Sequence, residues 1–270
     1  MRMPSLSVLT VAATALMGTA AANAGILPAG GGVINTTETS YESLVLAPND
    51  VLNGIFNVSQ ITAASGITYT YGAGNYYLVG SFTGFTLNSS SAIPGGTRLY
   101  FTGGALNYYS FGADPFAGGA LTSGTPANQA ASLATIASGT LELALVPEVI
   151  YNGPGGQCPV VGCTLYIDVF GGLNSFAAAS TSTAYLDIVG GNLANAFVKD
   201  SLLNTFTAAL ADGQYQGSAN STQCQISPQW QVCGTNHATF SVIPEPITVS
   251  LFGAGLAGAA ALRRRKAKKA

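Results

Sequence analysis

The middle of this 270-residue chain has very few basic residues. Between Gly25 and Ile243, only Arg98 and Lys199 are basic, against ten acidic residues. This region therefore carries a formal charge of 2 − 10 = −8. An acidic surface repels the phosphate backbone of nucleic acids. We therefore expect no nucleic-acid partner.

The chain also has little of what hydrolytic and metal-dependent catalysis requires. Its single histidine, His237, would have to serve any Ser-His-Asp, Cys-His or imidazole metal site. The sequence G-x-S-x-G, which carries the nucleophile of many hydrolases, does not occur. These absences favour a protein that is not an enzyme and has no metal or cofactor.

The first 24 residues have the pattern of a secretory signal peptide. Arg2 precedes an apolar stretch over residues 6–17, and Ala22 and Ala24 form an A-x-A site before Gly25. A base, an apolar core and a small-residue cleavage site, in this order, direct a chain to the secretion machinery. We expect export and cleavage after Ala24.

Four cysteines lie in the part of the chain that would be exported, and their number is even. Exported proteins form disulfides, whereas zinc sites need reduced thiols. Each neighbouring pair lies in a loop-like stretch whose Gly or Pro residues allow the chain to turn back. Pairing of neighbours also costs the least loop-closure entropy. We therefore predict the disulfides Cys158–Cys163 and Cys224–Cys233, with zinc binding as the alternative.

Residues 25–243 predict a mainly β domain. Short runs rich in β-branched and aromatic residues, such as FNVSQIT and ITYTYG, alternate apolar and polar side chains and are separated by Gly, Asn, Ser and Pro. This pattern is typical of half-buried antiparallel strands. We expect a β-sandwich or jelly-roll-like fold.

Two segments, from Pro126 and over residues 192–210, favour one or two peripheral helices. The first segment has an alanine-rich interior, and in the second Leu193, Phe197, Leu202 and Phe206 lie roughly on one side of a helix. A chain divided into two lobes near Pro126 is the alternative architecture.

Two short sequences, YIDVFGG at residues 166–172 and YLDIVGG at residues 185–191, repeat one pattern. They are either two neighbouring strands with the same in–out alternation, or they bring Asp168 and Asp187 together. A carboxylate pair could bind calcium or perform acid–base chemistry on a glycan. Aromatic residues between Tyr69 and Phe116 leave open a second kind of glycan contact, by stacking on sugar rings.

The end of the chain contrasts with its middle. Residues 247–262 carry no charge and would form a transmembrane helix about 24 Å long, slightly short of the ~30 Å hydrocarbon core, a gap that snorkelling of Arg263 and local thinning of the membrane can close. A cluster of bases follows, which would stop transfer and stay in the cytoplasm. It consists of Arg263, Arg264, Arg265, Lys266, Lys268 and Lys269.

Pro244-Glu245-Pro246, the apolar segment and the basic end together resemble the PEP-CTERM sorting domain of exported bacterial proteins. The resemblance covers residues 244–270 and implies processing near Pro244, Glu245 and Pro246 by an exosortase, a membrane enzyme. It also implies association with exopolysaccharide, as in a biofilm or floc matrix, at the cell surface or outside the cell.

We therefore expect a signal peptide at residues 1–24, a β-rich domain at 25–243 and a sorting segment at 244–270. The expected function is that of a non-enzymatic surface or matrix protein. A secreted carbohydrate-binding module or glycan hydrolase is the alternative, and a membrane protein that keeps its anchor is a third.

Overall fold

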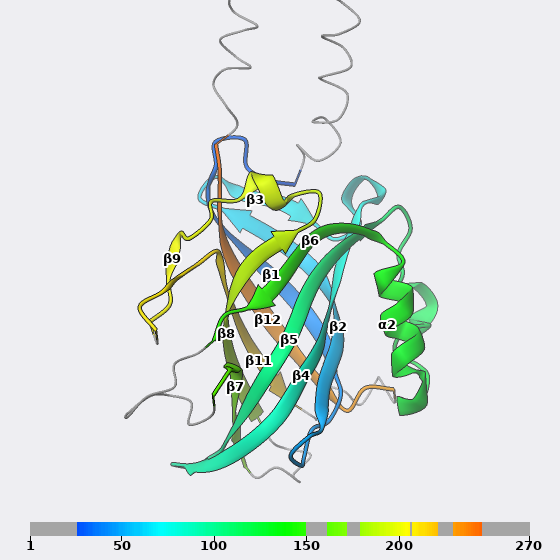
Figure 1. Cartoon of the computed structure of the whole chain (residues 1–270). Coiled ribbons are helices and arrows are strands. Elements are labelled where there is room, and N and C mark those ends of the chain that lie inside the picture. Colours follow the sequence, from blue (N-terminus) through cyan, green and yellow to red (C-terminus); the bar gives the residue numbers. More distant parts are fainter. Residues whose placement is uncertain (1–25, 150–160, 172–178, 206, 221–228, 245–270) are drawn as a thin grey trace, which may run out of the picture.

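The computed structural model of the chain describes residues 26–149, 161–171, 179–205, 207–220 and 229–244. Most of these residues belong to one antiparallel sheet that closes into a barrel-like form (Figure 1). Its strands are β1 (Gly32–Glu42), β2 (Val51–Ala63), β3 (Gly66–Thr70), β4 (Tyr77–Ile93), β5 (Gly96–Phe111), β6 (Thr140–Pro147), β7 (Cys163–Phe170), β8 (Ala179–Gly190), β11 (Gly213–Asn220) and β12 (Val232–Val242).

The smaller elements decorate this sheet. A two-stranded hairpin consists of β9 (Leu202–Leu203) and β10 (Leu210–Ala211), and the α-helix of the described residues is α2 (Gln129–Ala137). Short 3-10 helices are η1 (Ala73–Asn75), η2 (Ala117–Gly119), η3 (Pro126–Asn128) and η4 (Ala194–Ala196).

The sheet closes because β1 pairs with strands from both ends of the strand order. The order β1-β12-β11-β8-β6-β5-β4-β2 returns to β1 through a β1–β2 ladder. Strands β6 and β7 share one position, since each pairs with both β5 and β8 at different heights. The described domain is therefore a closed ring of eight strand positions, and β3 extends it at one edge.

Alternation along each strand separates the inside of the ring from the outside. On β1, Ile34, Thr36 and Glu38 are buried, whereas Asn35 and Thr39 are exposed. Successive side chains of a strand point to opposite faces, so one set fills the interior. The resulting core is largely apolar and aromatic, with contributions from every strand position of the ring.

Cross-strand pairs of glycine and phenylalanine make room for this core. Gly54 lies opposite Phe82, and Gly80 lies opposite Phe56. A β-carbon at Gly80 would overlap the ring of Phe56, and one at Gly54 would overlap the ring of Phe82. The missing side chains thus create the space in which the rings lie flat across the neighbouring strand, and Phe56 then packs edge-on against Tyr108 at 5.1 Å.

Helix α2 forms a second layer outside the ring (Figure 1). It follows η3, which Thr125 and Asn128 begin with a capping box. Ile136 of α2 packs with Ile55 of β2 and Val79 of β4. The separate cluster also contains Tyr109, Leu121, Trp230 and Cys233.

The mainly β prediction with a peripheral helix from Pro126 is confirmed. The sandwich or jelly-roll expectation is corrected, since the strands form one closed sheet instead of two stacked sheets. Strands from before and after Pro126 pair with each other, so the two-lobed alternative is wrong. Strand order depends on pairings between distant segments, which alternation within a strand does not encode.

The helix predicted over residues 192–210 does not form. The segment contains η4, the β9–β10 hairpin and left-handed backbone at Asp200 (φ 53°) and Ala208 (φ 59°). Leu193 and Phe197 are buried at one end of the barrel, where they cover the core. Their spacing therefore serves this cover and does not indicate a helix.

In the described parts of the chain, no helix is long and apolar enough to cross a membrane. The predicted signal peptide (1–24) and transmembrane segment (247–262) lie outside the described residues. The domain boundaries stay predictions.

The glycine–phenylalanine pairs generate a stability prediction. Replacing Gly80 with Ala should force Phe56 out of its position, and overpacking of this kind costs roughly 1–3 kcal/mol. Urea unfolding of the purified protein should show a lower midpoint for Gly80→Ala. Gly112→Ala is the matched control, because a β-carbon at Gly112 meets nothing within 4 Å. Equal midpoints for the two variants would contradict the packing role of Gly80.

Candidate functional site

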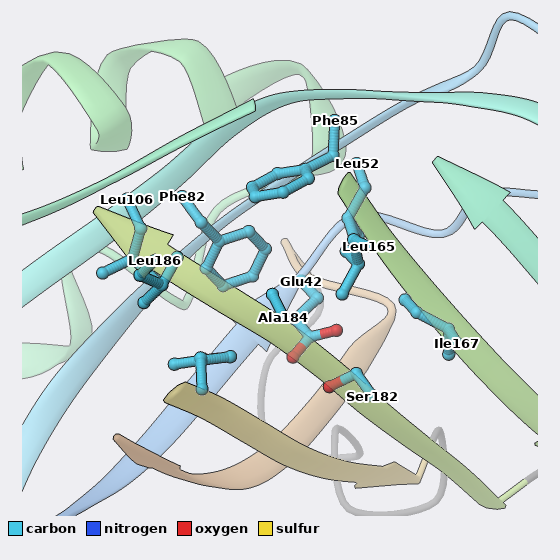
Figure 2. A pocket seen from close by; sticks show the side chains of 11 residues that line it. Glu42, Leu52, Phe82, Phe85, Leu106, Leu165, Ile167, Ser182, Ala184 and Leu186 are labelled. Carbon is cyan, nitrogen blue, oxygen red and sulfur yellow. The ribbon is translucent and has the colours of Figure 1, made fainter. Parts of the chain in front are cut away.

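The inside of the barrel is a packed core and leaves little room for a ligand. One cavity of about 30 Å³ opens among apolar side chains, with the Glu42 carboxylate and the Ser182 hydroxyl directed into it (Figure 2). A second cavity of about 30 Å³ lies at the end that Phe197 covers. Such volumes hold one or two water molecules, whereas small-molecule sites typically occupy about 300–1,000 Å³.

Two glutamates of β1 nevertheless face this interior. Glu38 is fully buried, and its Oε1 accepts hydrogen bonds from Thr36 Oγ1 and Tyr108 OH, each 2.7 Å long. Glu42 is half-buried as a residue, and its Oε1 accepts a 2.7 Å bond from Ser40 Oγ. Among the described residues, Glu38 Oε2 has no hydrogen-bond partner.

No base balances these carboxylates in the described part of the chain. Arg98 is paired with Asp168 on the outside, and Lys199 donates to the carbonyl of Ile188. Burial raises the pKa of Glu38 and of Glu42 to about 7, from 4.5, although the hydroxyl bonds act in the opposite direction. Burial disfavours the charged form of a carboxyl group. Both groups are therefore largely protonated in the folded protein below neutral pH.

The two aspartates predicted as a carboxylate pair are not brought together. Asp168 lies opposite Thr181 of β8, six residues before Asp187 on that strand. Six residues of strand span about 20 Å, well beyond the 5–9.5 Å that separates glycosidase carboxylates. The repeated sequences are neighbouring strands with the same alternation, as the first of the two interpretations held.

Asp168 instead holds a structural ion pair. Arg98 Nε and Nη2 contact its two carboxylate oxygens at 2.5 and 2.7 Å, and the guanidinium lies 4.3 Å from the centre of the Tyr166 ring. This bidentate geometry ties β5 to β7 and leaves Asp168 without the open coordination that calcium needs.

Asp187 belongs to an acidic group on the other part of β8. Burial raises its pKa to about 6, and Glu148, Asp212 and Asp200 add to the rise by repulsion. Asp212 is already occupied, because its carboxylate accepts from the amides of Ile188 and Asp200. In the part of the chain that the structure describes, no three His, Cys, Asp or Glu residues are placed to hold a metal ion.

The adjacent Tyr108 and Tyr109 do not form an exposed stacking strip. Tyr108 points into the barrel, and Tyr109 lies outside it under the α2 layer. Tyr100 is buried against Cys163 and Tyr166. The second layer that covers Tyr109 therefore explains how both members of a pair can be buried.

Neither of the two described cysteines is a free thiol. Cys163 begins β7 and Cys233 belongs to β12. Cys158 and Cys224 lie outside the described residues, so the predicted pairing stays a prediction.

Part of the outer face of β1, β12, β11 and β8 is a broad surface without a charged side chain, and Asp187, on the same face of β8, lies just beyond its edge. We call it the polar face. It consists of Asn35, Thr37, Thr39, Thr235, His237, Thr239, Gln214, Gln216, Ser218, Thr181 and Thr183.

Register aligns the residues of the polar face in rows across the strands. One row runs from Thr39 through Thr235 and Ser218 to Thr181, each directly opposite the next. A parallel row joins His237, Gln216 and Thr183. Neighbouring strands lie about 4.8 Å apart, and same-face residues about 6.8 Å apart along a strand. The result is a regular grid of hydroxyl, amide and imidazole groups.

Sequence reasoning missed this face, although a signal was present. The segments NTTETS and TNHATFS place Asn, Thr and His at every second position. Alternation shows that these residues face outward, but only the strand order shows that the four strands adjoin.

The buried glutamates generate a prediction of pH dependence. Their pKa values are higher in the folded than in the unfolded chain, so the unfolded chain binds fewer protons between about pH 4.5 and 7. Stability should therefore fall as pH rises through this range, by on the order of 3 kcal/mol per glutamate. Urea midpoints from pH 4.5 to 8 would measure the fall.

In Glu38→Gln the fall should be smaller, and stability at pH 8 should be higher than in the unsubstituted protein. Asp50→Asn is the control, because amide hydrogen bonds lower the pKa of this exposed carboxylate and so keep its titration below the tested range. A pH profile that is unchanged in Glu38→Gln would contradict the interior assignment.

The last described residues connect β12 to the C-terminal segment that contains the Pro244-Glu245-Pro246 motif. Strand β12 ends at Val242, and Ile243 and Pro244 are exposed beyond it. Glu245, Pro246 and the basic cluster lie outside the described residues.

A comparison with curated proteins and with solved structures finds no match for this chain. Residues 242–266 match the family model of the PEP-CTERM protein-sorting motif. The chain therefore carries a PEP-CTERM protein-sorting motif, which indicates an exported protein with a C-terminal membrane-anchoring sorting signal and implies processing by exosortase, a membrane enzyme.

Proposed function

We propose that the chain is a non-enzymatic surface or extracellular-matrix protein whose barrel-like domain contacts exopolysaccharide through the polar face. The sorting segment supports export and processing. The observation that carries the contact is the grid of uncharged polar groups across β1, β12, β11 and β8.

The chemistry of the polar face fits a neutral polysaccharide. Hydroxyl and amide groups both donate and accept hydrogen bonds, as the hydroxyl groups of a sugar chain do. The face has no charged side chain in a domain whose formal charge is −8, so a neutral chain approaches it without the repulsion that an anionic chain would meet. Repeated weak contacts along a polymer add up through effective concentration.

The packed interior supports an external site. Cavities of about 30 Å³ cannot enclose a sugar, so a glycan would have to bind on the outside. A glycan hydrolase based on Asp168 and Asp187 finds no support in their positions on β7 and β8. A carbohydrate-binding role would use the same polar face and differs from the matrix role only in its biological setting.

Negative charge introduced on the polar face tests the contact. Thr235→Glu together with Ser218→Glu should weaken binding to the neutral polysaccharide fraction of the producing cells' matrix by about tenfold, because buried charge and lost hydrogen bonds both cost free energy. Affinity gel electrophoresis would measure it. Ser123→Glu, at an exposed residue between η2 and η3, is the matched control. Equal retardation of the two proteins would contradict the assignment of the face.

Substitutions in the motif test processing. Glu245→Ala should leave export intact and cause the uncut precursor to accumulate in the inner membrane, because the processing enzyme no longer recognises its site. Neutral replacements of residues 263–269 should instead let the chain pass through the membrane before processing, because the stop-transfer charge is lost. Immunoblots of membrane and surface fractions distinguish the two. Normal processing of Glu245→Ala would contradict the role of the motif.

A further inference from the structure

The sorting segment begins inside the folded domain, without a linker. The matched residues start at Val242, the last residue of β12, which is paired with Gly32 of β1. Val242 also forms a bridge with Phe197. The amide of Ile243 donates a 2.8 Å hydrogen bond to the carbonyl of Ala196. One residue therefore separates the last strand from Pro244, and that residue is itself hydrogen-bonded to the fold.

Pro244 also packs on the beginning of the domain. Gly31 precedes β1 in left-handed backbone (φ 65°), and a β-carbon there would lie 2.5 Å from the nitrogen of Pro244. The described chain thus starts and ends at one end of the barrel (Figure 1). An enzyme that acts at residues 244–246 must approach this end closely.

Three exposed apolar side chains surround the exit of the chain. Val33 lies opposite Ser241, and the carbonyl of Ser241 accepts a 2.8 Å bond from the amide of Val198. Ile243 follows Ser241 by two residues and so faces the same side. Val33, Val198 and Ile243 are 50%, 37% and 44% exposed. We call these three residues the exit patch.

The exit patch joins segments that are far apart in the sequence: the start of β1, the residues after η4 and the end of β12. Single exposed apolar residues are common on protein surfaces. These three lie around Ser241 on one side of the chain exit, next to the first residue of a recognition motif, where a partner must already be close. Exclusion of water from them would add binding free energy to recognition of the motif.

We propose that the exit patch is a docking surface for the membrane enzyme that processes residues 244–246. This inference rests on the proposed processing of the chain. The enzyme then recognises the folded barrel end together with the motif, and the absence of a linker fixes the two at one distance. An unfolded domain would present the motif without the patch and would be processed more slowly.

Charged substitutions in the exit patch test the proposal in the full-length chain. Val33→Asp and Val198→Asp should each slow conversion of the precursor by about tenfold in a pulse-chase experiment. Val51→Asp, at an exposed valine of β2 that lies opposite Thr86, is the matched control and should be converted at the normal rate. Equal rates for all three variants would overturn the proposal, provided that thermal unfolding shows them to be folded.

A flexible six-residue Gly-Ser insertion between Ile243 and Pro244 gives an independent test. The proposal predicts slower conversion, because patch and motif lose their fixed spacing. Faster conversion would overturn it and indicate that the barrel end only obstructs the enzyme.

An assay with purified enzyme and detergent-solubilised precursor distinguishes docking of the exit patch on the enzyme from contact of the patch with membrane lipid. Slow conversion of Val33→Asp in detergent supports the enzyme as the partner. A normal rate in detergent, with a slow rate in cells, would overturn the proposal in favour of the lipid surface. Glu245→Ala serves as the reference for the proposed function: if it blocks conversion while the patch variants do not, only the docking inference fails.

Discussion

Strand β1 is hydrogen-bonded along both of its edges, to β12 on one side and to β2 on the other. This double pairing joins the first and last strands of the domain and closes the sheet. Closure removes the unpaired backbone edges that an open sheet would present at these strands. The alternation of β1 then decides what lies inside, and it places Glu38 and Glu42 there together with apolar residues. The arrangement of the whole domain depends on this strand.

Closure also directs function to the outside. A ring of eight strand positions has an interior just wide enough for its side chains. Phenylalanine rings over cross-strand glycines fill much of it, and the two cavities described among the core side chains measure about 30 Å³ each, whereas an open hollow of about 420 Å³ lies beside β3 and η1. The external surfaces are then divided among three features. These are the α2 layer, the polar face and the end at which the chain leaves toward the sorting segment.

Much of the fold was predictable from local sequence. Alternation predicted the strands, and a proline followed by an alanine-rich stretch predicted α2. The motif Pro244-Glu245-Pro246 with its flanking segments was recognisable because linear order alone carries the signal. The closed sheet was not predictable, because it depends on which distant strands pair.

The same reason explains the errors at the candidate sites. Asp168 and Asp187 occupy equivalent places in two similar sequences, yet the strands run antiparallel and separate them along β8. Leu193 and Phe197 have helical spacing, but the demand for a cover on the open barrel end determines their structure. The polar face emerged only when register aligned residues from four strands.

The central claim is that the sorting segment is cleaved from the barrel-like domain, so that the mature protein lacks it. Intact-mass measurement of the protein isolated from its native surface tests it most directly. The account predicts a mass that corresponds to a chain beginning at Gly25 and lacking residues 247–270. A surface protein that still carries a peptide from residues 247–262 would contradict the account and indicate a permanently anchored membrane protein.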